Sequence, residues 1–396
     1  MDNTQPQAKL ETSVADIARL FLRLGATAFG GPAAHIAIME REIVQQRKWL
    51  SHKRFIDLLG AANLIPGPNS TEVAMHISQT QAGLPGLICG GVCFILPAAI
   101  MVSMIAALYV QFGHIPQTEA VLYGLKPVVI AIVAQALWRL GRVALSSVQA
   151  ILIATAVAAL SVLGLNEIAL LFAPGLLAVL TRFRAEPFSK ERNVVLALVS
   201  VSVLIIIFAV FLGAYAPASL PFSLPALFLY FLKVGSVLYG SGYVLLAFLR
   251  TDLVEHYHWI TSAQLLDATA VGQITPGPVF TTATFIGYLL AGPLGALIAT
   301  VGIFLPAFIL VALTARLVEK VRESAVAAWF LDAVNAAALA LMAVVTFQLA
   351  QAALVDWLTV ALALFSLIVL ICTKLNSVWL MVGGAVCGLL YKGLSG

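Results

Sequence analysis

The sequence predicts an all-α polytopic membrane protein built from two homologous halves, and three observations support this prediction. Of its 396 residues, 61% are hydrophobic and only 10% are charged, against about 25% charged residues in an average soluble domain. The mean hydropathy is +1.02. Long apolar runs recur along the chain, and one half of the sequence repeats the other. Because a crossing helix needs about 20 apolar residues, the chain has room for about 9–13 membrane segments and no soluble catalytic domain.

The charged residues and the cysteines point to no soluble partner. The formal net charge of +4 falls mostly in short loops such as 182–192, where it informs orientation rather than nucleic-acid binding. Residues 1–12 are polar and the first apolar stretch holds Arg19 and Arg23, which argues against a cleaved signal peptide. Neither a nucleotide-binding loop nor a metal-ligand pattern is found, so we expect no metal, no cofactor and no enzymatic activity. The cysteines lie in or beside apolar segments, without a disulfide pattern: Cys89, Cys93, Cys372 and Cys387.

An internal repeat divides the chain. A shift of 210 positions, which brings Phe21 onto Phe231, superposes two stretches without a gap, and the match continues with one residue dropped. It predicts a first repeat at 13–190, a linking transmembrane segment within 191–224, and a second repeat at 225–396. Duplicated halves recur in transporters, whose substrate site lies near mid-membrane where the halves meet. Matching pairs include Gly25/Gly235, Trp49/Trp259, Asp57/Asp267, Gly67/Gly277, Gly86/Gly295 and Pro97/Pro306.

Two kinds of apolar segment are distinguished. Uninterrupted runs predict crossing helices at about 88–111, 121–139, 148–164, 168–181, 193–214, 293–315, 327–350, 354–371 and 376–391. Four other segments, near 13–39, 55–80, 225–249 and 263–290, carry helix breakers in the middle: Gly30-Gly31-Pro32, Pro66-Gly67-Pro68, Gly240-Ser241-Gly242 and Pro276-Gly277-Pro278. Proline removes an amide donor and clashes with the preceding turn, so none of these four is expected to be one regular helix.

The broken segments are either kinked crossings or re-entrant hairpins. In lipid, a broken backbone survives only where it is buried in protein or lines a cavity. Four hairpins would leave nine crossings and place every strongly basic loop, including 41–54, on the cytoplasmic side; thirteen crossings would put that loop outside. We prefer the hairpins. Both topologies place the N-terminus inside and the C-terminus outside, and both invert the second half relative to the first.

The Pro-Gly-Pro motifs indicate an anion site. The stretch 63–72, with Asn63, Asn69 and Thr71, matches 273–282, with Gln273, Thr275 and Thr281. Each breaker is followed by the start of a helix, where unpaired amides and the positive end of the dipole attract anions. Two such starts from opposite halves would converge on one anion. In the alternative interpretation the prolines only set packing, and Asn69 forms a capping box with Glu72.

Ionisable residues inside apolar segments are further candidates. Glu72 and His76 lie four residues apart on one helix face, where they could pass protons; a cap for Glu72 and a packing role for His76 are the alternative. Arg23 and Lys233 occupy matching positions in the two halves and would suit a dianion, unless they snorkel towards the headgroups. Lys126 has the same two interpretations. The glycines of 29–32 and 239–242 would allow close approach of a ligand or of another helix.

With Phe29-Gly30-Gly31-Pro32 and His35, Pro66-Gly67-Pro68-Asn69, and their repeats, the chain resembles the two-domain, long-chain members of the chromate ion transporter family. The resemblance covers about 13–391 and implies export of chromate from the bacterial cytoplasm across the inner membrane, driven by an ion gradient and conferring chromate resistance. The predicted substrate-binding residues are Arg23, Gly30, Gly31, Pro32, His35, Asn63, Pro66, Gly67, Pro68, Asn69, Thr71, Lys126, Lys233, Gly240, Gly242, Gln273, Thr275, Pro276, Gly277, Pro278 and Thr281, with Glu72 and His76 for proton coupling.

Other functions stay open at this point. Sulfate has the shape and charge of chromate, and no sequence feature separates the two. An anion channel on the same fold, and a membrane enzyme acting on lipid phosphates, are the competing classes; the second lacks a nucleophile and a metal site. The expected partners are a small oxyanion and the lipid bilayer. Whether the chain forms a homodimer is not fixed by the sequence.

Overall fold

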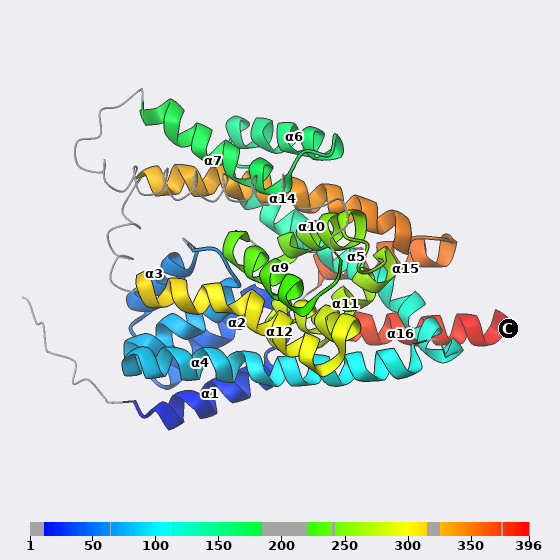
Figure 1. Cartoon of the computed structure of the whole chain (residues 1–396), viewed down its shortest axis with the longest axis horizontal. Coiled ribbons are helices and arrows are strands. Elements are labelled where there is room, and N and C mark those ends of the chain that lie inside the picture. Colours follow the sequence, from blue (N-terminus) through cyan, green and yellow to red (C-terminus); the bar gives the residue numbers. More distant parts are fainter. Residues whose placement is uncertain are drawn as a thin grey trace, which may run out of the picture.

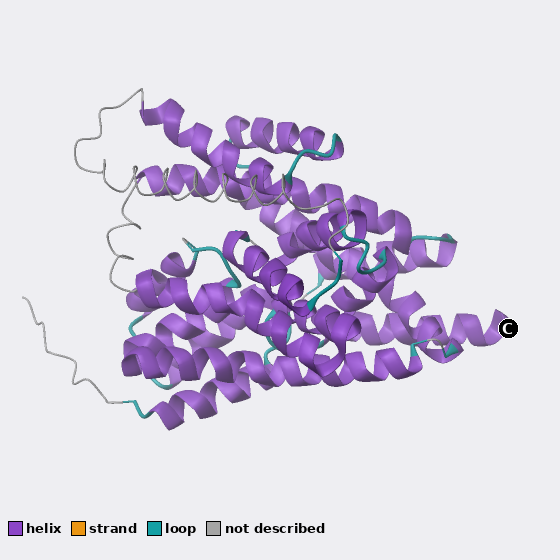
Figure 2. Cartoon of the chain, in the orientation of Figure 1, coloured by secondary structure: helices purple, strands orange, loops and turns teal. Residues whose placement is uncertain are grey.

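The structure, a computed structural model, describes residues 12–63, 65–113, 115–183, 221–239, 242–314, 325–373 and 375–395. Every regular element in these ranges is a helix (Figure 2). The linking segment 193–214, the basic loop 316–322, Gly240 and Ser241 lie outside the described residues. The elements of the first half are α1 (Val14–Thr27), α2 (Gly31–Glu40), the π-helix η1 (Arg41–Gln46), α3 (His52–Ala62), α4 (Asn69–Phe112), α5 (Pro116–Ala144), α6 (Val148–Val162) and α7 (Glu167–Phe183).

The second half repeats this order. Its elements are α9 (Leu224–Val237), the 3-10 helix η2 (Gly242–Val244), α10 (Leu245–Phe248), the π-helix η3 (Leu249–His256), α11 (Ser262–Ile274), the 3-10 helix η4 (Val279–Thr281), α12 (Thr282–Thr314), α14 (Ala325–Ala353), α15 (Trp357–Cys372) and α16 (Ser377–Ser395). Each half therefore places two short broken units ahead of its long helices.

Long apolar helices confirm a polytopic membrane protein. Five segments of the described residues are long and apolar enough to cross a membrane: Asn69–Phe112, Pro116–Ala144, Val279–Thr314, Ala328–Ala353 and Ser377–Leu394. The outer face of α4 carries an apolar stripe at a spacing of four residues, and each member is about half exposed: Leu84, Ile88, Val92, Leu96, Ile100, Met104 and Leu108. In water such a stripe would be costly, whereas in a bilayer it faces lipid.

The longest helix, α4, is a hairpin rather than one rod. Its 44 residues would extend about 66 Å if straight, twice the hydrocarbon thickness. Ala82 and Gly83 leave helical geometry, and Gly83 has a φ of +62°. Behind this point the chain folds back, because Gly90 packs against the side chain of Ser78. The segments predicted at 55–80 and 88–111 therefore belong to a short broken unit and a long crossing helix.

The second half bends in the same way. Gly292, with a φ of +61°, and the preceding Ala291 interrupt α12. The hydroxyls of Thr284 and Thr300 lie 2.7 Å apart, a contact possible only because the chain reverses between them. In Figure 1 the colour gradient of the long arm of α4 runs along the molecule in the opposite direction to that of α12. The inverted placement of the halves across a membrane stays a prediction.

All four predicted breaks fall where helices end. Thr27 and Val237 end the first helix of each half, Ile274 ends α11, and α3 ends at Ala62 ahead of the first Pro-Gly-Pro motif. Gly30 and Gly31 have φ values of +104° and +76°, which explains why the sequence has glycines there. The break is thus encoded by residues that favour non-helical backbone.

Small local features also recur at the repeat distance. Both halves contain a π-helix, and each is followed by a non-glycine residue of positive φ: Lys48 at +54° and His258 at +53°. Gly25 packs on the backbone oxygen of Phe94, and Gly235 packs in the same way on Ile303. These close contacts hold α1 against α4 and α9 against α12.

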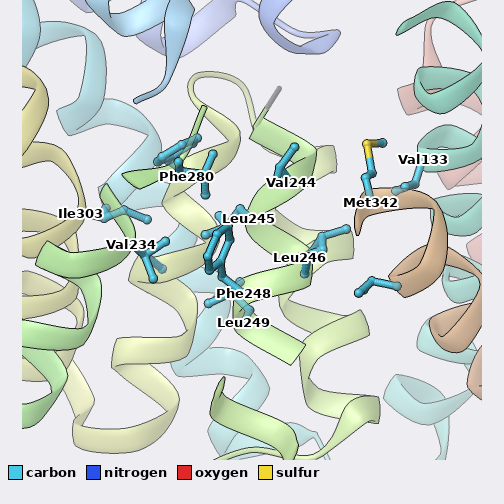
Figure 3. Close-up of a cluster of buried hydrophobic side chains, with 14 of the residues drawn as sticks. Val133, Val234, Val244, Leu245, Leu246, Phe248, Leu249, Phe280, Ile303 and Met342 are labelled. Atoms are coloured by element: carbon cyan, nitrogen blue, oxygen red, sulfur yellow. The ribbon is translucent and has the colours of Figure 1, made fainter. Parts of the chain in front are cut away.

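The apolar core surrounds the broken units of the second half. Val234 of α9, Leu245 and Phe248 of α10, and Phe280 of η4 point toward one another in Figure 3. Phe280 is 1% exposed, and its ring centroid lies 6.1 Å from that of Phe304. Broken backbone is therefore buried in protein here, as it must be inside a membrane.

Candidate functional site

The two Pro-Gly-Pro loops are tied to the opposite halves by a matching pair of hydrogen bonds. The amide of Gly67 donates to the carbonyl oxygen of Leu238 at 2.9 Å, and the amide of Gly277 donates to that of Ala28 at 3.0 Å. Ala28 and Leu238 are the C-cap residues that directly follow α1 and α9. Each loop of one half therefore closes on the first break of the other. These two glycine amides are occupied and do not bind an anion in this arrangement.

His35 reinforces one of these two connections between the halves, the one at Ala28. Its Nε2 lies 3.0 Å from the carbonyl oxygen of Ala28, which accepts only, so Nε2 carries the proton. Nδ1 of the neutral ring then accepts from the hydroxyl of Ser70 at 3.3 Å. The ring is 1% exposed. His35, predicted to bind substrate, thus has both nitrogens engaged and holds the α1–α2 break against the start of α4.

The start of α4 carries no side-chain cap. Its N-cap residue is Pro68, and no side chain of the described residues bonds to the first backbone amides. The side-chain Nδ2 of Asn69 donates to Oδ1 of Asn63 at 2.8 Å. The capping box with Glu72 is therefore absent from the described residues. The backbone amides of Thr71 and Glu72 donate to the carbonyl oxygen of Pro68, which leaves the amides of Asn69 and Ser70 without a partner among the described residues, and the anion-site interpretation depends on these two.

Several buried polar atoms near these loops have no partner among the described residues. They are Thr71 Oγ1, both oxygens of Glu72, His76 Nε2 and Gln273 Nε2. More than nine in ten buried polar groups in proteins are hydrogen-bonded, so this concentration is unusual. Gln273 Nε2 is a free donor from the second half, whereas the Gln273 side-chain oxygen accepts from Tyr243 at 3.4 Å. The hydroxyl of Tyr243 also reaches Gly31: a Cβ added there would lie 3.6 Å from it.

Glu72 is the most deeply buried acid here. It is 0% exposed, and its carboxyl lies against Gly67. Tyr239, from the opposite half, is within electrostatic range. His76 shares its helix face, but no hydrogen bond joins the two side chains in the part of the chain that the structure describes. An unpaired carboxylate in such surroundings would cost several kcal/mol or more.

The two predicted cations of the first helices have carboxylate partners. Arg23 lies 2.5 Å from Glu42, and Lys233 lies 2.7 Å from Asp252. The acids occupy matching positions in the two π-helices. Arg23 is 51% exposed, whereas the Lys233 pair is mostly buried. Both charges are balanced within their own half, which favours a structural role over direct contact with substrate.

Lys126 also has an acidic partner, but it borders open space. Its Nζ is 3.2 Å from Oδ1 of Asp267, and Tyr109 donates to the other carboxylate oxygen at 3.0 Å. All three line a cavity of about 520 Å³, together with Glu119 and Lys392. Lys126 thus lines a cavity at one end of the molecule.

The remaining predicted site residues shape the backbone. Gly67 and Gly277 have φ values of +142° and +91°. The hydroxyl of Thr275 donates to the carbonyl oxygen of Val271 in the last turn of α11, and that of Thr281 donates to Pro278, at 2.8 Å each, so neither hydroxyl hydrogen is free for a ligand. The others line the breaks or begin the next helix: Gly30, Pro32, Pro66, Gly242, Pro276 and Pro278. Gly240 lies outside the described residues.

Sequence reasoning missed the acidic partners. Glu42 and Asp252 stand 210 residues apart, the same distance as Arg23 and Lys233, and that repeated charge pattern could have revealed the two ion pairs. Asp267 was noticed only as a repeat match. No cluster of His, Cys, Asp or Glu that could hold a metal is found in the residues the structure describes.

The fold and these interlocked breaks define a duplicated, polytopic membrane protein with a polar site between its halves. A family model described as "Chromate transporter" matches residues 15–218 and 225–389. The chain therefore belongs to the chromate transporter family, as its motifs predicted.

Three curated relatives match this chain along most of their length. The chromate transport protein of Cupriavidus metallidurans is 31% identical over 383 residues, which cover 93% of this chain and 91% of the relative. That of Pseudomonas aeruginosa is 32% identical, covering 87% and 84%. The probable chromate transport protein of Synechococcus elongatus is 29% identical, covering 90% and 89%. No solved structure matches the chain.

Proposed function

We propose that this chain is a secondary active transporter that exports chromate across the inner membrane of a bacterium and so confers chromate resistance. Family membership supports chromate as the substrate. The observation that supports the site is the set of unpartnered polar atoms, Gln273 Nε2 foremost, beside two broken helices from opposite halves. Chromate is a tetrahedral dianion, so free amide donors and helix starts suit its oxygens.

The driving force follows from charge. With a membrane potential negative inside, export of each negative charge is assisted by about 2.3 kcal/mol per 100 mV. A counter-moving proton would add to this drive. Glu72 is our candidate for the proton carrier, because its carboxyl is buried without a partner and a charge there is costly. His76 is the second candidate, since its Nε2 is also unpartnered.

Sulfate is the second candidate substrate. Sulfate has the same shape and charge as chromate, and a site made of amides and side-chain donors recognises an anion only by its shape and charge. A channel for such anions is the alternative mechanism. Under our proposal the N-terminus is cytoplasmic, the C-terminus is outside, and the chain catalyses no reaction.

Uptake of radiolabelled chromate into respiring everted vesicles tests the proposal, because everted membranes turn export into accumulation. We expect saturable, energy-dependent uptake, absent from empty vesicles and from a Gly67→Ala/Pro68→Ala variant present at equal amount in the membrane. Competition by excess sulfate would show that the site accepts both anions. Wild-type uptake no higher than that of empty vesicles would overturn chromate export.

A further inference from the structure

The cavity of about 520 Å³ lies at the end of the molecule where α4 and α14 finish and α5 and α11 begin, toward the C-terminus in Figure 1. Its lining combines cations, acids and tyrosines, an unusual mixture for a membrane protein. Lys126 and Lys392 are the lysines, and Glu119 and Asp267 the acids. Ionisable residues inside a membrane domain are costly and mark functional paths.

Lys126 and Asp267 are unequally placed in this cavity. The Lys126 side chain is 21% exposed, whereas that of Asp267 is 4% exposed and also receives the hydroxyl of Tyr109. The lysine therefore faces the open space while the carboxylate is fixed behind it. Although Nζ and Oδ1 are 3.2 Å apart, Oδ1 has no hydrogen bond of good geometry among the described residues. The pair is in Coulombic contact, and donors of the ammonium are left for another acceptor.

The pair belongs to one end of the molecule. Lys126 of the first half is matched by Asn335 in the second half, and Asp267 of the second half is matched by Asp57 in the first. The carboxylate is thus duplicated but the lysine is not. A packing device common to both halves would have kept both partners, as the Arg23–Glu42 and Lys233–Asp252 pairs do.

We infer that Lys126 is an oxyanion-binding residue of this cavity and that Asp267 is its tethered competitor, which a tetrahedral dianion displaces. The arriving dianion carries twice the charge of the carboxylate, so it attracts the ammonium more strongly at equal distance. Tyr109 retains Asp267 when the lysine turns away. Asp267 and Gln273 lie on α11 about 9 Å apart along its axis, so one helix carries both a lining residue of the cavity and the unpartnered donor between the halves. The inference rests on the proposed function.

Opposite effects of two neutralising substitutions test the exchange. Purified protein is reconstituted, and the KM for chromate is measured from the side that the cavity faces. We expect Lys126→Gln to raise KM about tenfold, the scale of one charge-assisted hydrogen bond, with a small change in maximal rate. Asp267→Asn lowers KM about threefold, the scale of a partly exposed ion pair. Lys126→Arg keeps KM near wild type, because it retains the positive charge and the donors.

The result that overturns the inference is a pair of shifts of the same sign, or no shift in either variant; both describe an ion pair that serves folding only. If Lys126→Gln fails to reach the membrane, Asp267→Asn decides alone, because only displacement predicts a lower KM. Failure of the proposed function is recognised separately: the wild-type protein then moves neither chromate nor sulfate.

Discussion

The amide of Gly67 donates to the carbonyl oxygen of Leu238, and 210 residues later the amide of Gly277 donates to that of Ala28. Each bond joins a Pro-Gly-Pro loop of one half to the end of the first helix of the other. The reciprocity is that of an isologous contact, in which the same surfaces meet twice around a pseudo-twofold axis. The candidate substrate site lies where these bonds draw the halves together.

Alanine in place of Gly67 or Gly277 should disrupt the contact between the two halves. Gly67→Ala places a side chain against the Glu72 carboxyl, and Gly277→Ala places one against Ala98. Both glycines also have positive φ, so each variant loses about 1–3 kcal/mol. We expect lower melting temperatures in detergent and loss of chromate uptake. Gly83→Ala is the matched control: φ is positive but its surroundings are open, so it should lower stability by about 1–2 kcal/mol yet keep uptake. Normal uptake by Gly67→Ala would contradict this account.

The ion pairs of the first helices should matter for stability more than for substrate. Removing one partner of a buried pair costs about 3–5 kcal/mol, whereas an exposed pair is worth about 1 kcal/mol or less. Lys233→Gln should therefore destabilise far more than Arg23→Gln, because the Lys233 pair is mostly buried and Arg23 is half exposed. Thermal unfolding measures both. The double variant Lys233→Met/Asp252→Leu should regain stability and transport; a stable but inactive double variant would instead make Lys233 a substrate ligand.

A pH dependence follows from the end of η3. The hydrogen bond with Asp252 raises the pKa of His256 above its usual value of 6.5. Burial alone would raise the pKa of Asp252, but the nearby Lys233 and His256 outweigh the effect of burial, so the pKa of Asp252 is lowered. A raised histidine pKa contributes stability below pH 6.5 that is lost as pH rises through the folded-state pKa. The melting temperature should fall as the pH rises above 6.5 through the raised pKa of His256, and His256→Gln should flatten that fall. An unchanged profile in His256→Gln would show that the contact contributes nothing.

Glu72→Gln should separate proton coupling from substrate binding. Glutamine keeps the shape of the acid but binds no proton, so we expect loss of uptake driven by a pH gradient with retention of chromate exchange at equal pH. His76→Gln is the parallel test of the second candidate. Uptake by Glu72→Gln that still responds to the pH gradient would remove Glu72 as the carrier.

Gln273→Leu should weaken binding much more than stability. Replacing a buried donor that has no partner by an apolar group removes a desolvation cost of about 1–3 kcal/mol, which offsets the loss of the 3.4 Å hydrogen bond from Tyr243, so the melting temperature should stay level. The KM for chromate should increase at least about tenfold, since one donor to a charged oxygen is lost. Thr269→Val is the control on the same helix, because its hydroxyl is satisfied by Leu265. If KM stays level in Gln273→Leu, Gln273 is not a ligand.

The architecture could be predicted from the sequence because helix breaks and the internal duplication are both visible in the positions of glycine and proline. Glycine and proline impose backbone geometry wherever they occur, so Gly30 and Pro66 marked helix ends correctly. Charge roles were harder. Arg23 and Lys233 were predicted to bind substrate because they are cations at matching positions in the two halves, and that role stays a prediction. Their carboxylate partners, Glu42 and Asp252, lie 19 residues further along, and only the reversal after the first helix brings each pair together. The contacts of His35 with Ala28 and Ser70 could not be predicted either, because they join segments that only the folded chain brings together.

Counterflow in proteoliposomes tests the central claim most directly, because it needs only the purified chain. Vesicles loaded with unlabelled chromate are diluted into a trace of labelled chromate, and the label inside is followed with time. An alternating carrier predicts a transient accumulation above equilibrium, which saturates with outside chromate and is lost in Gln273→Leu. A flux that rises linearly without overshoot would mean a channel, and no flux at all would contradict transport by this chain.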